Sequence, residues 1–116
     1  MHLKECYTKL GGNYADVIDR LKQEEMIIRF IHIFAQENLP ERIKDAIASR
    51  NARAAFCAAH SLKGNCMSLG FVRLHKTAEE ITSLLRRNQI NKAASVLVSL
   101  EAEYERTIKI ISQVNA

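Results

Sequence analysis

Apolar residues recur every three or four positions along most of this chain, which is the spacing that gathers them on one face of an α-helix. Glycine and proline interrupt helices and asparagine caps them, so these residues divide the pattern into segments. We therefore predict six helices: residues 14–21, 23–37, a short helix that begins at Pro40, 51–69, 71 to about 87, and a last helix from about residue 91 whose apolar repeat continues to Val114.

The ends of these helices carry recognisable signals. Asn13 and Asn51 each precede an amphipathic segment, where an asparagine side chain caps the first turn. Gly70 follows the longest alanine-rich segment and is expected to end that helix and open the return turn. Arg86 and Arg87 complement the negative end of the helix dipole in the last turn of the next helix.

Composition agrees with an all-α protein. The chain has 116 residues, of which 47% are apolar, and only one proline and four glycines, so one compact helical core is expected. Long amphipathic helices with short connections predict an antiparallel four-helix bundle with one or two short extra N-terminal helices. We assign residues 1–12 to an N-terminal extension and 13–116 to the domain; whether the extension docks on the bundle stays open. The heptad-like repeat of the last helix fits core packing better than a dimer seam, so we expect a monomer.

Charge and segment length limit the possible surroundings. The net charge of +4 fits an acidic partner and a solvated surface equally well. Basic residues are dispersed without interleaved aromatic residues, which argues against nucleic-acid binding. No apolar stretch approaches the roughly 18 residues that span a membrane, and the first residues do not have the order of a secretory signal. We therefore expect a cytoplasmic protein.

The cysteines and histidines do not form a metal-binding pattern. Cys6, Cys57 and Cys66 are an odd number at unrelated spacings, and two of them lie in apolar helical stretches, which suits reduced thiols better than disulfides. A set of Cys57, His60, Cys66 and His75 has no paired Cys-x-x-Cys or His-x-x-x-His spacing. No metal site is predicted.

A helical wheel of residues 53–69 separates two faces, with about 100° between successive residues. The expected core side holds Ala55, Ala58, Ala59, Leu62, Cys66 and Leu69. The opposite, outward side holds Arg53, Phe56, His60, Lys63, Gly64 and Met67. His60 is therefore predicted to project away from the core, with Lys63 and Gly64 one turn further along.

The outward face combines residue types suited to one chemistry. Neutral histidine is a nucleophile near neutral pH, and the Lys63 ammonium binds phosphoryl oxygens as a point charge. Gly64 costs about 1 kcal/mol against alanine inside a helix, and a bare backbone beside His60 leaves room for another molecule. Phe56 and Met67 flank the histidine as an apolar docking surface. Alternatives remain: a packing glycine, a solvated lysine, and partial burial of Phe56 and Met67.

The segment from His60 to Gly70, HSLKGNCMSLG, resembles the signature of histidine phosphotransfer domains. That signature reads His-x-(Leu/Ile)-Lys-Gly, then small residues, then an aliphatic residue and a glycine ten positions after the histidine. Six positions match: His60, Leu62, Lys63, Gly64, Leu69 and Gly70. The helix layout is similar from about Tyr14 to the C-terminus, so the resemblance covers most of the chain.

This resemblance implies a phosphorelay carrier in two-component signalling. His60 would accept a phosphoryl group, Lys63 would stabilise it, and Gly64 would keep space open. The donor would be a receiver-domain aspartyl phosphate or a sensor histidine kinase, and the acceptor another response-regulator receiver aspartate. The receiver would bring Mg²⁺, so no cofactor of its own and no autonomous catalysis are expected of this chain, which is sparse in catalytic groups.

One position departs from the family pattern. Family members often place Gln or Glu on the following helix to orient the histidine, whereas the matching residue here is Thr82. Whether Thr82 or His75 takes that role stays open. Two other readings also remain: an interaction module that works without phosphorylation, and the phospho-accepting domain of a larger hybrid or chemotaxis-type kinase.

Overall fold

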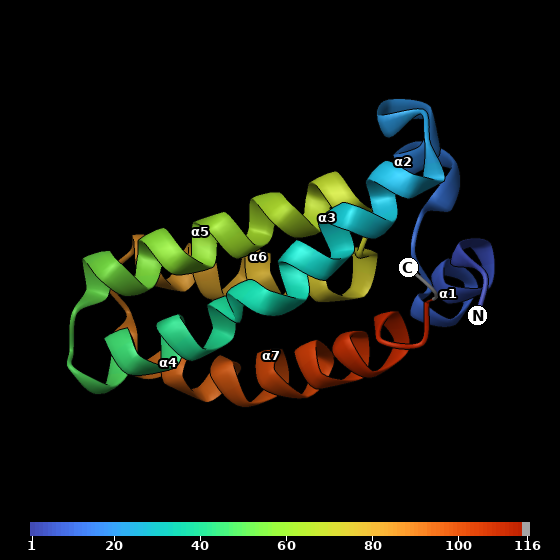
Figure 1. Cartoon of the computed structure of the whole chain (residues 1–116). Coiled ribbons are helices and arrows are strands. Elements are labelled where there is room, and N and C mark those ends of the chain that lie inside the picture. The colour runs from blue at the N-terminus through green and yellow to red at the C-terminus, as the bar shows by residue number, and fades with distance from the viewer. Residues whose placement is uncertain (115–116) are drawn as a thin grey trace.

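The computed structural model describes residues 1–114, which form seven helices and no strand (Figure 1). They are α1 (Leu3–Leu10), α2 (Tyr14–Leu21), α3 (Glu24–Glu37), α4 (Leu39–Ala48), α5 (Ala52–Leu69), α6 (Val72–Arg86) and α7 (Ile90–Ile111). The six predicted helices are present with bounds close to those expected. The all-α prediction is confirmed, and α1 is an additional helix that the sequence pattern did not single out.

Four rods make up the bundle. Helices α5, α6 and α7 are three of them, and α3 and α4 follow one another to make the fourth (Figure 1). Helix α5 packs mainly against α4 and α6, and α7 packs mainly against α6 and α4. Helices α5 and α7 therefore occupy opposite corners of the bundle. This arrangement gives the molecule two separate sides, one along α5 and one along α7.

Local signals explain where the helices start and stop. The side chains of Asn13 and Asn51 accept hydrogen bonds from the backbone N–H groups of Asp16 at 3.1 Å and Ala54 at 3.0 Å, as expected of N-caps. Gly70 ends α5 with φ of 69°, and a Cβ there would lie 2.5 Å from Val17 Cγ2. Only glycine suits this turn, because both its left-handed backbone and its close neighbour exclude a side chain.

Helix α1 docks on one end of the bundle. Its Leu3, Cys6, Tyr7 and Leu10 side chains are buried in the common core. The Tyr7 hydroxyl donates a 2.6 Å hydrogen bond to the carbonyl oxygen of Leu69 at the end of α5. Arg106 of α7 donates to the carbonyl oxygen of Lys9 at 2.6 Å. The first residues are therefore tied to both α5 and α7, which answers the question that the sequence left open.

The apolar repeat of the last helix is a core stripe. Its members Leu97, Leu100, Tyr104 and Ile111 are buried within the bundle. The helix ends at Ile111, earlier than the repeat indicated, although Val114 beyond it is also buried.

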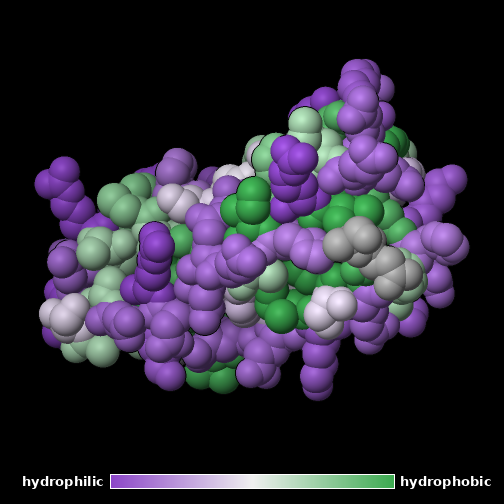
Figure 2. Space-filling view, viewed as in Figure 1, coloured by the Kyte–Doolittle hydropathy of each residue, from purple (hydrophilic) through white to green (hydrophobic). Residues whose placement is uncertain are grey.

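Hydrophilic side chains cover most of the face in Figure 2, and apolar side chains show between α3 and the end of α7.

The thiols are not all in one kind of environment. Cys6 and Cys66 are buried, whereas Cys57 is exposed on α5. Burial raises the pKa of the Cys6 thiol to about 11 and also raises the pKa of Cys66. Both buried cysteines therefore stay protonated at neutral pH.

Among residues 1–114, no helix has the length and apolar character that a membrane crossing requires.

Candidate functional site

Helix α5 presents His60 to solvent from the middle of a firmly anchored rod. Ala55, Ala59, Leu62, Cys66 and Leu69 are buried, which confirms the predicted core side apart from half-buried Ala58. His60, Gly64 and Met67 are exposed, as the wheel predicted, and 58% of Met67 is accessible. Phe56 and Lys63 are only half-buried rather than fully outward, because both lean toward α6, whose residues share hollows with them.

Gly64 is not a packing glycine. A Cβ built on it meets nothing within 4 Å, other than the backbone of its own helix. The residue lies one turn after His60 on the exposed side of α5. No neighbouring helix accounts for the glycine, so the structure favours the reading in which it leaves free space beside the histidine.

An aromatic contact holds the histidine from the other direction. The rings of Phe56 and His60 stack with centroids 5.7 Å apart and planes inclined by 21°. The Arg86 guanidinium of α6 lies over the Phe56 ring, 5.6 Å from its centroid. Cation–π contacts of this kind are attractive. Arg86 and His60 are therefore connected through one shared aromatic ring.

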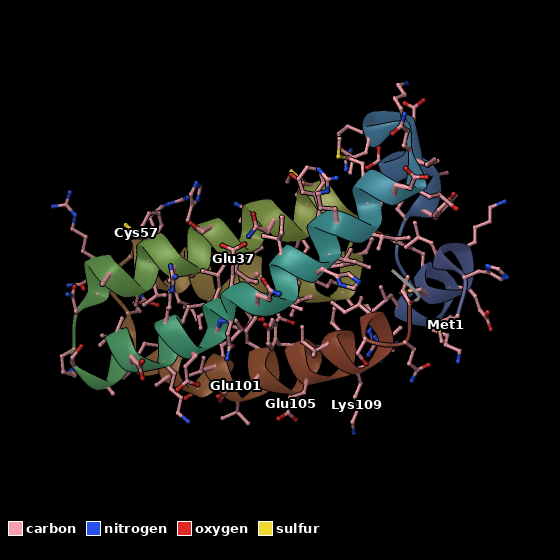
Figure 3. All side chains as sticks on the ribbon, viewed as in Figure 1. Met1, Glu37, Cys57, Glu101, Glu105 and Lys109 are labelled. Carbon is pink, nitrogen blue, oxygen red and sulfur yellow. The ribbon has the colours of Figure 1, made fainter. Side chains whose placement is uncertain are left out.

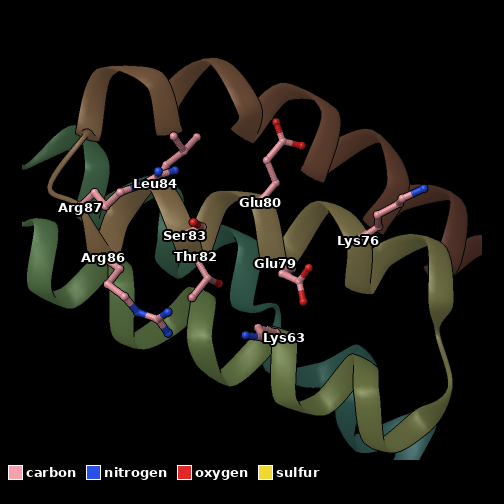
Figure 4. Close-up of a pocket in the computed structure, with 9 residues that line it drawn as sticks. All are labelled: Lys63, Lys76, Glu79, Glu80, Thr82, Ser83, Leu84, Arg86 and Arg87. Carbon is pink, nitrogen blue, oxygen red and sulfur yellow. The ribbon is translucent and has the colours of Figure 1, made fainter.

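A hollow of about 680 Å³ lies between α5 and α6 next to Lys63 (Figure 4). Its walls carry the four cations Lys63, Lys76, Arg86 and Arg87 and the two carboxylates Glu79 and Glu80. The lining thus has two more positive than negative groups. In Figure 4 the side chains of Lys63 and Arg86 both reach into the space between the two helices. Such a surface attracts anions.

A smaller hollow of about 280 Å³ continues along the same side, around Phe56. Arg53 of α5 and Arg86 of α6 both line it. Arg53 was expected on the outward face, and it is exposed there. Three cations therefore surround the stretch from Phe56 to Lys63, and His60 lies in the middle of that stretch.

Arg86 is the residue that sequence reasoning missed as part of this site. The sequence alone indicates only that Arg86 complements the helix dipole at the end of α6. The signal in the sequence is its spacing, because Arg86 lies one turn after Thr82 on the same side of α6. The register between α5 and α6 was needed to place it near Phe56.

Thr82 and His75 do not contact His60 by any hydrogen bond within residues 1–114. The Thr82 side chain is buried, and its hydroxyl donates a 2.6 Å bond to the carbonyl oxygen of Ala78. The Thr82 hydroxyl has therefore no proton left to donate to His60. His75 lies seven residues before Thr82, about 10 Å along the helix axis, and its buried Nε2 has no hydrogen-bond partner among the described residues.

The described residues contain no group of three His, Cys, Asp or Glu side chains that is arranged to hold a metal ion. The side chains around His60 are aromatic, aliphatic and cationic instead. Their chemistry suits an incoming anion rather than a resident cation.

Comparison with known proteins identifies the class. The family model of the Hpt domain matches residues 33–109, from α3 almost to the end of α7, and the chain belongs to this family. Neither the curated proteins nor the solved structures contain a significant match to it. The match supports a role in histidine phosphotransfer within two-component phosphorelays, in which such domains interact with receiver domains or kinases.

Proposed function

We propose that His60 carries the phosphoryl group in this relay, accepting it from a receiver-domain aspartyl phosphate or from a sensor histidine kinase and passing it to a receiver aspartate. The observation that carries the proposal is the exposed His60 ring beside Gly64, where a Cβ would meet no neighbour. A second protein can thus bring a phosphorylated side chain up to the ring without meeting a side chain at that position.

The transfer needs little from the carrier itself. The lone pair of the unprotonated ring nitrogen attacks phosphorus in line with the leaving oxygen. The phosphorus–nitrogen bond forms as the phosphorus–oxygen bond to the receiver aspartate breaks, and the carboxylate leaves with the electron pair. The proton on the other ring nitrogen stays in place. Positioning and charge neutralisation dominate such reactions, so we propose no autonomous catalysis and no cofactor for this chain, with Mg²⁺ supplied by the receiver.

We assign the stabilisation of the transferred group to two cations. Lys63 lies one turn after His60, and its ammonium offers a mobile point charge to the phosphoryl oxygens. Arg86 approaches from α6, held over Phe56 at 5.6 Å. Both belong to the hollow between α5 and α6 that carries a positive excess. We therefore assign the role of phosphoryl stabilisation to Lys63 with Arg86 as the second contributor.

The partner would dock over the exposed side of α5. Gly64 leaves the approach open, Met67 offers an exposed apolar contact, and Phe56 with Arg53 forms the other flank. Helix α3, which contacts α5, adds further exposed apolar side chains: Met26, Phe30 and Ile33. An apolar surface rimmed by cations is typical of a protein interface. A monomeric carrier in the cytoplasm remains our prediction, with residues 1–12 as an N-terminal extension that packs on the core of the domain.

The test is transfer of a radioactive phosphoryl group. The full chain is incubated with receiver domains phosphorylated on aspartate and with autophosphorylated sensor-kinase cores, and labelled protein is isolated. We expect a label that is labile in acid and stable in base, as for a phosphohistidine. The His60→Gln variant should lose it, whereas His32→Gln, which replaces another exposed histidine, should keep it.

The outcomes separate the alternatives. Label that persists in His60→Gln overturns the assignment of the residue. A receiver that binds equally well to wild type and His60→Ala, with no label transfer in either direction, indicates the phosphorylation-independent interaction module instead. Transfer only from a kinase core favours the phospho-accepting domain of a larger kinase.

A further inference from the structure

A second channel runs along α7, on the side of the bundle away from α5. One hollow of about 300 Å³ lies between α3 and α7, and a neighbouring hollow of about 440 Å³ shares Ile108 and Ser112 with it. A third, of about 190 Å³, shares Tyr104 and Glu105 with the second and reaches the start of α4. Shared lining residues make the three hollows one continuous channel between α7 and the α3–α4 rod.

One end of this channel is apolar. Ile31 and Ala35 of α3 face Ile108 and Ile111 of α7 across the first hollow. Ile108 and Ala35 are only partly buried, so apolar surface is open to solvent there. Figure 2 shows apolar side chains at the surface in this region between α3 and the end of α7.

The other end of the channel is acidic. Glu41 of α4 and Glu101 and Glu105 of α7 line the third hollow. Burial raises the pKa of the Tyr104 phenol, and the negative charge of Glu37 raises it further, which indicates that Glu37 lies close to Tyr104. Within residues 1–114 none of these four carboxylates takes part in an ion pair. In Figure 3 Glu37 lies at the end of α3, and Glu101 and Glu105 follow one another along α7.

The two ends follow one another along a straight path. Tyr104, Ile108 and Ile111 are spaced four and three residues apart, so they share one face of α7. From Glu101 to Ser112 the helix advances about 17 Å, which is about three turns of an α-helix. The channel thus runs from an acidic end, past one cation at Lys109, to an apolar end. A short helix with cationic side chains in one half and apolar side chains in the other would match its length and the surfaces at its two ends.

We propose that this channel binds a short helix of a partner protein. Along the length of that helix, one half would carry apolar side chains and the other half Lys or Arg side chains. The apolar half would cover the open parts of Ala35 and Ile108, and the cationic half would meet Glu41, Glu101 and Glu105, which line the third hollow. The binding sites lie on opposite corners of the bundle, so this partner and the phosphoryl donor can be bound together. Holding a partner on α7 would raise its effective concentration at the bundle.

The test uses the full chain labelled with ¹⁵N and a synthetic helical peptide. The peptide has about 14 residues, enough for about four turns, with its leucines in one half and its lysines in the other. We expect backbone shift changes at Ile31, Ala35, Glu101 and Ile108, and none at His60 or Gly64. A control peptide with glutamate in place of each lysine should not bind.

A matched pair of variants tests the charges. Glu101→Gln combined with Glu105→Gln should weaken peptide binding about three- to tenfold, as expected for partly exposed ion pairs. Glu79→Gln combined with Glu80→Gln removes the same number of carboxylates from α6 and should leave binding unchanged. All four residues are exposed or half-buried, so both variants should fold, which circular dichroism would check.

Three results would overturn the proposal: shift changes centred on His60, equal binding of the glutamate peptide, or no difference between the two double variants. Phosphoryl transfer to His60 in the presence of saturating peptide provides a separate readout. Because the channel lies away from α5, the transfer rate should not change, and failure of transfer in the absence of peptide would count only against the proposed function.

Discussion

The His60 and Phe56 rings stack one turn apart on α5, with their centroids separated by 5.7 Å and their planes inclined by 21°. The imidazole is exposed, yet the stack restricts the directions that it can face. A nucleophile that is both accessible and oriented needs less reorganisation when the donor arrives. Phe56 is therefore a positioning residue in our proposal.

Replacement of Phe56 tests this role. Phe56→Leu keeps an apolar side chain but removes the ring, and aromatic pairs contribute about 0.5–1.5 kcal/mol beyond their buried area. We expect the rate of phosphoryl transfer to fall about three- to tenfold. Phe56→Tyr keeps the stack and should restore the rate. Equal rates for the leucine and tyrosine variants, measured by transfer from a labelled receiver, would remove Phe56 from the mechanism.

Gly64→Ala should separate stability from function. Since a Cβ at this position meets nothing within 4 Å, alanine fits without a clash. Alanine favours the helix by about 1 kcal/mol over glycine, so the free energy of unfolding in urea should rise by about that amount. Transfer from the receiver should fall at least tenfold, because the methyl group occupies the approach to His60.

Ser61→Ala is the matched control, because Ser61 is exposed on the same helix. It should leave the transfer rate unchanged. A Gly64→Ala protein that transfers at the wild-type rate would show that the partner does not use this space.

Loss of either cation should slow the transfer. Lys63→Gln and Arg86→Gln each remove a positive charge from the lining of the hollow between α5 and α6. We expect each to lower the rate about tenfold, equivalent to about 1.4 kcal/mol of transition-state stabilisation, and the effect to shrink with added salt. Lys76→Gln removes a cation from the same hollow and should have a smaller effect, since Lys76 lies ten residues, or about 2.8 helical turns, before Arg86 on α6. Equal losses for all three variants would indicate a general attraction instead.

Thr82→Val should leave phosphoryl transfer unchanged. The Thr82 hydroxyl donates to the carbonyl oxygen of Ala78 within its own helix, so removing it breaks no bond to His60. The valine variant should also retain its fold, which urea unfolding would check. A clear drop in the transfer rate, with the fold intact, would contradict this and would assign Thr82 the orienting role that its position in the family pattern suggests.

Alkaline pH should destabilise the fold through the buried thiols. Burial raises the pKa of Cys6 from 9.0 to about 11. The unfolded chain therefore releases this proton at lower pH than the folded chain, and the stability present below pH 9 is lost as the pH rises toward 11. Urea unfolding at pH 8 and pH 10.5 should show the loss. The slope should be shallower in Cys6→Ala and unchanged in Cys57→Ser, whose thiol is already exposed.

The sequence predicted most of the helices because their signals are local. Apolar spacing, Asn13, Asn51 and Gly70 each act within a few residues, and the structure has the corresponding helices and caps. Helix α1 was not predicted as a helix because it is short and its docking depends on distant partners. The hydroxyl of Tyr7 bonds a carbonyl 62 residues away, at Leu69, and no local pattern contains that information.

The part of the candidate site on α5 was predictable because its signals are also local. The prediction was incomplete because the contribution of α6 depends on contacts between distant residues. A wheel of one helix was enough to place His60 and Gly64 on the exposed side of α5. It contained no register between α5 and α6, so the contact of Arg86 with Phe56 could not be foreseen. The same lack left the direction of the Lys63 side chain toward α6 undetermined.

Helix α5 is fastened at both ends, by the Asn51 cap at its start and by Gly70 and the Tyr7 hydrogen bond at its finish. Under the proposed function, phosphorylation of His60 would therefore change the charge of α5 and leave its backbone conformation unchanged. A phosphoryl group brings roughly two negative charges, about as many as Lys63 and Arg86 can cancel. Acceptance of the cargo would thus weaken the attraction that drew the donor in, and departure of the donor would follow from the delivery itself.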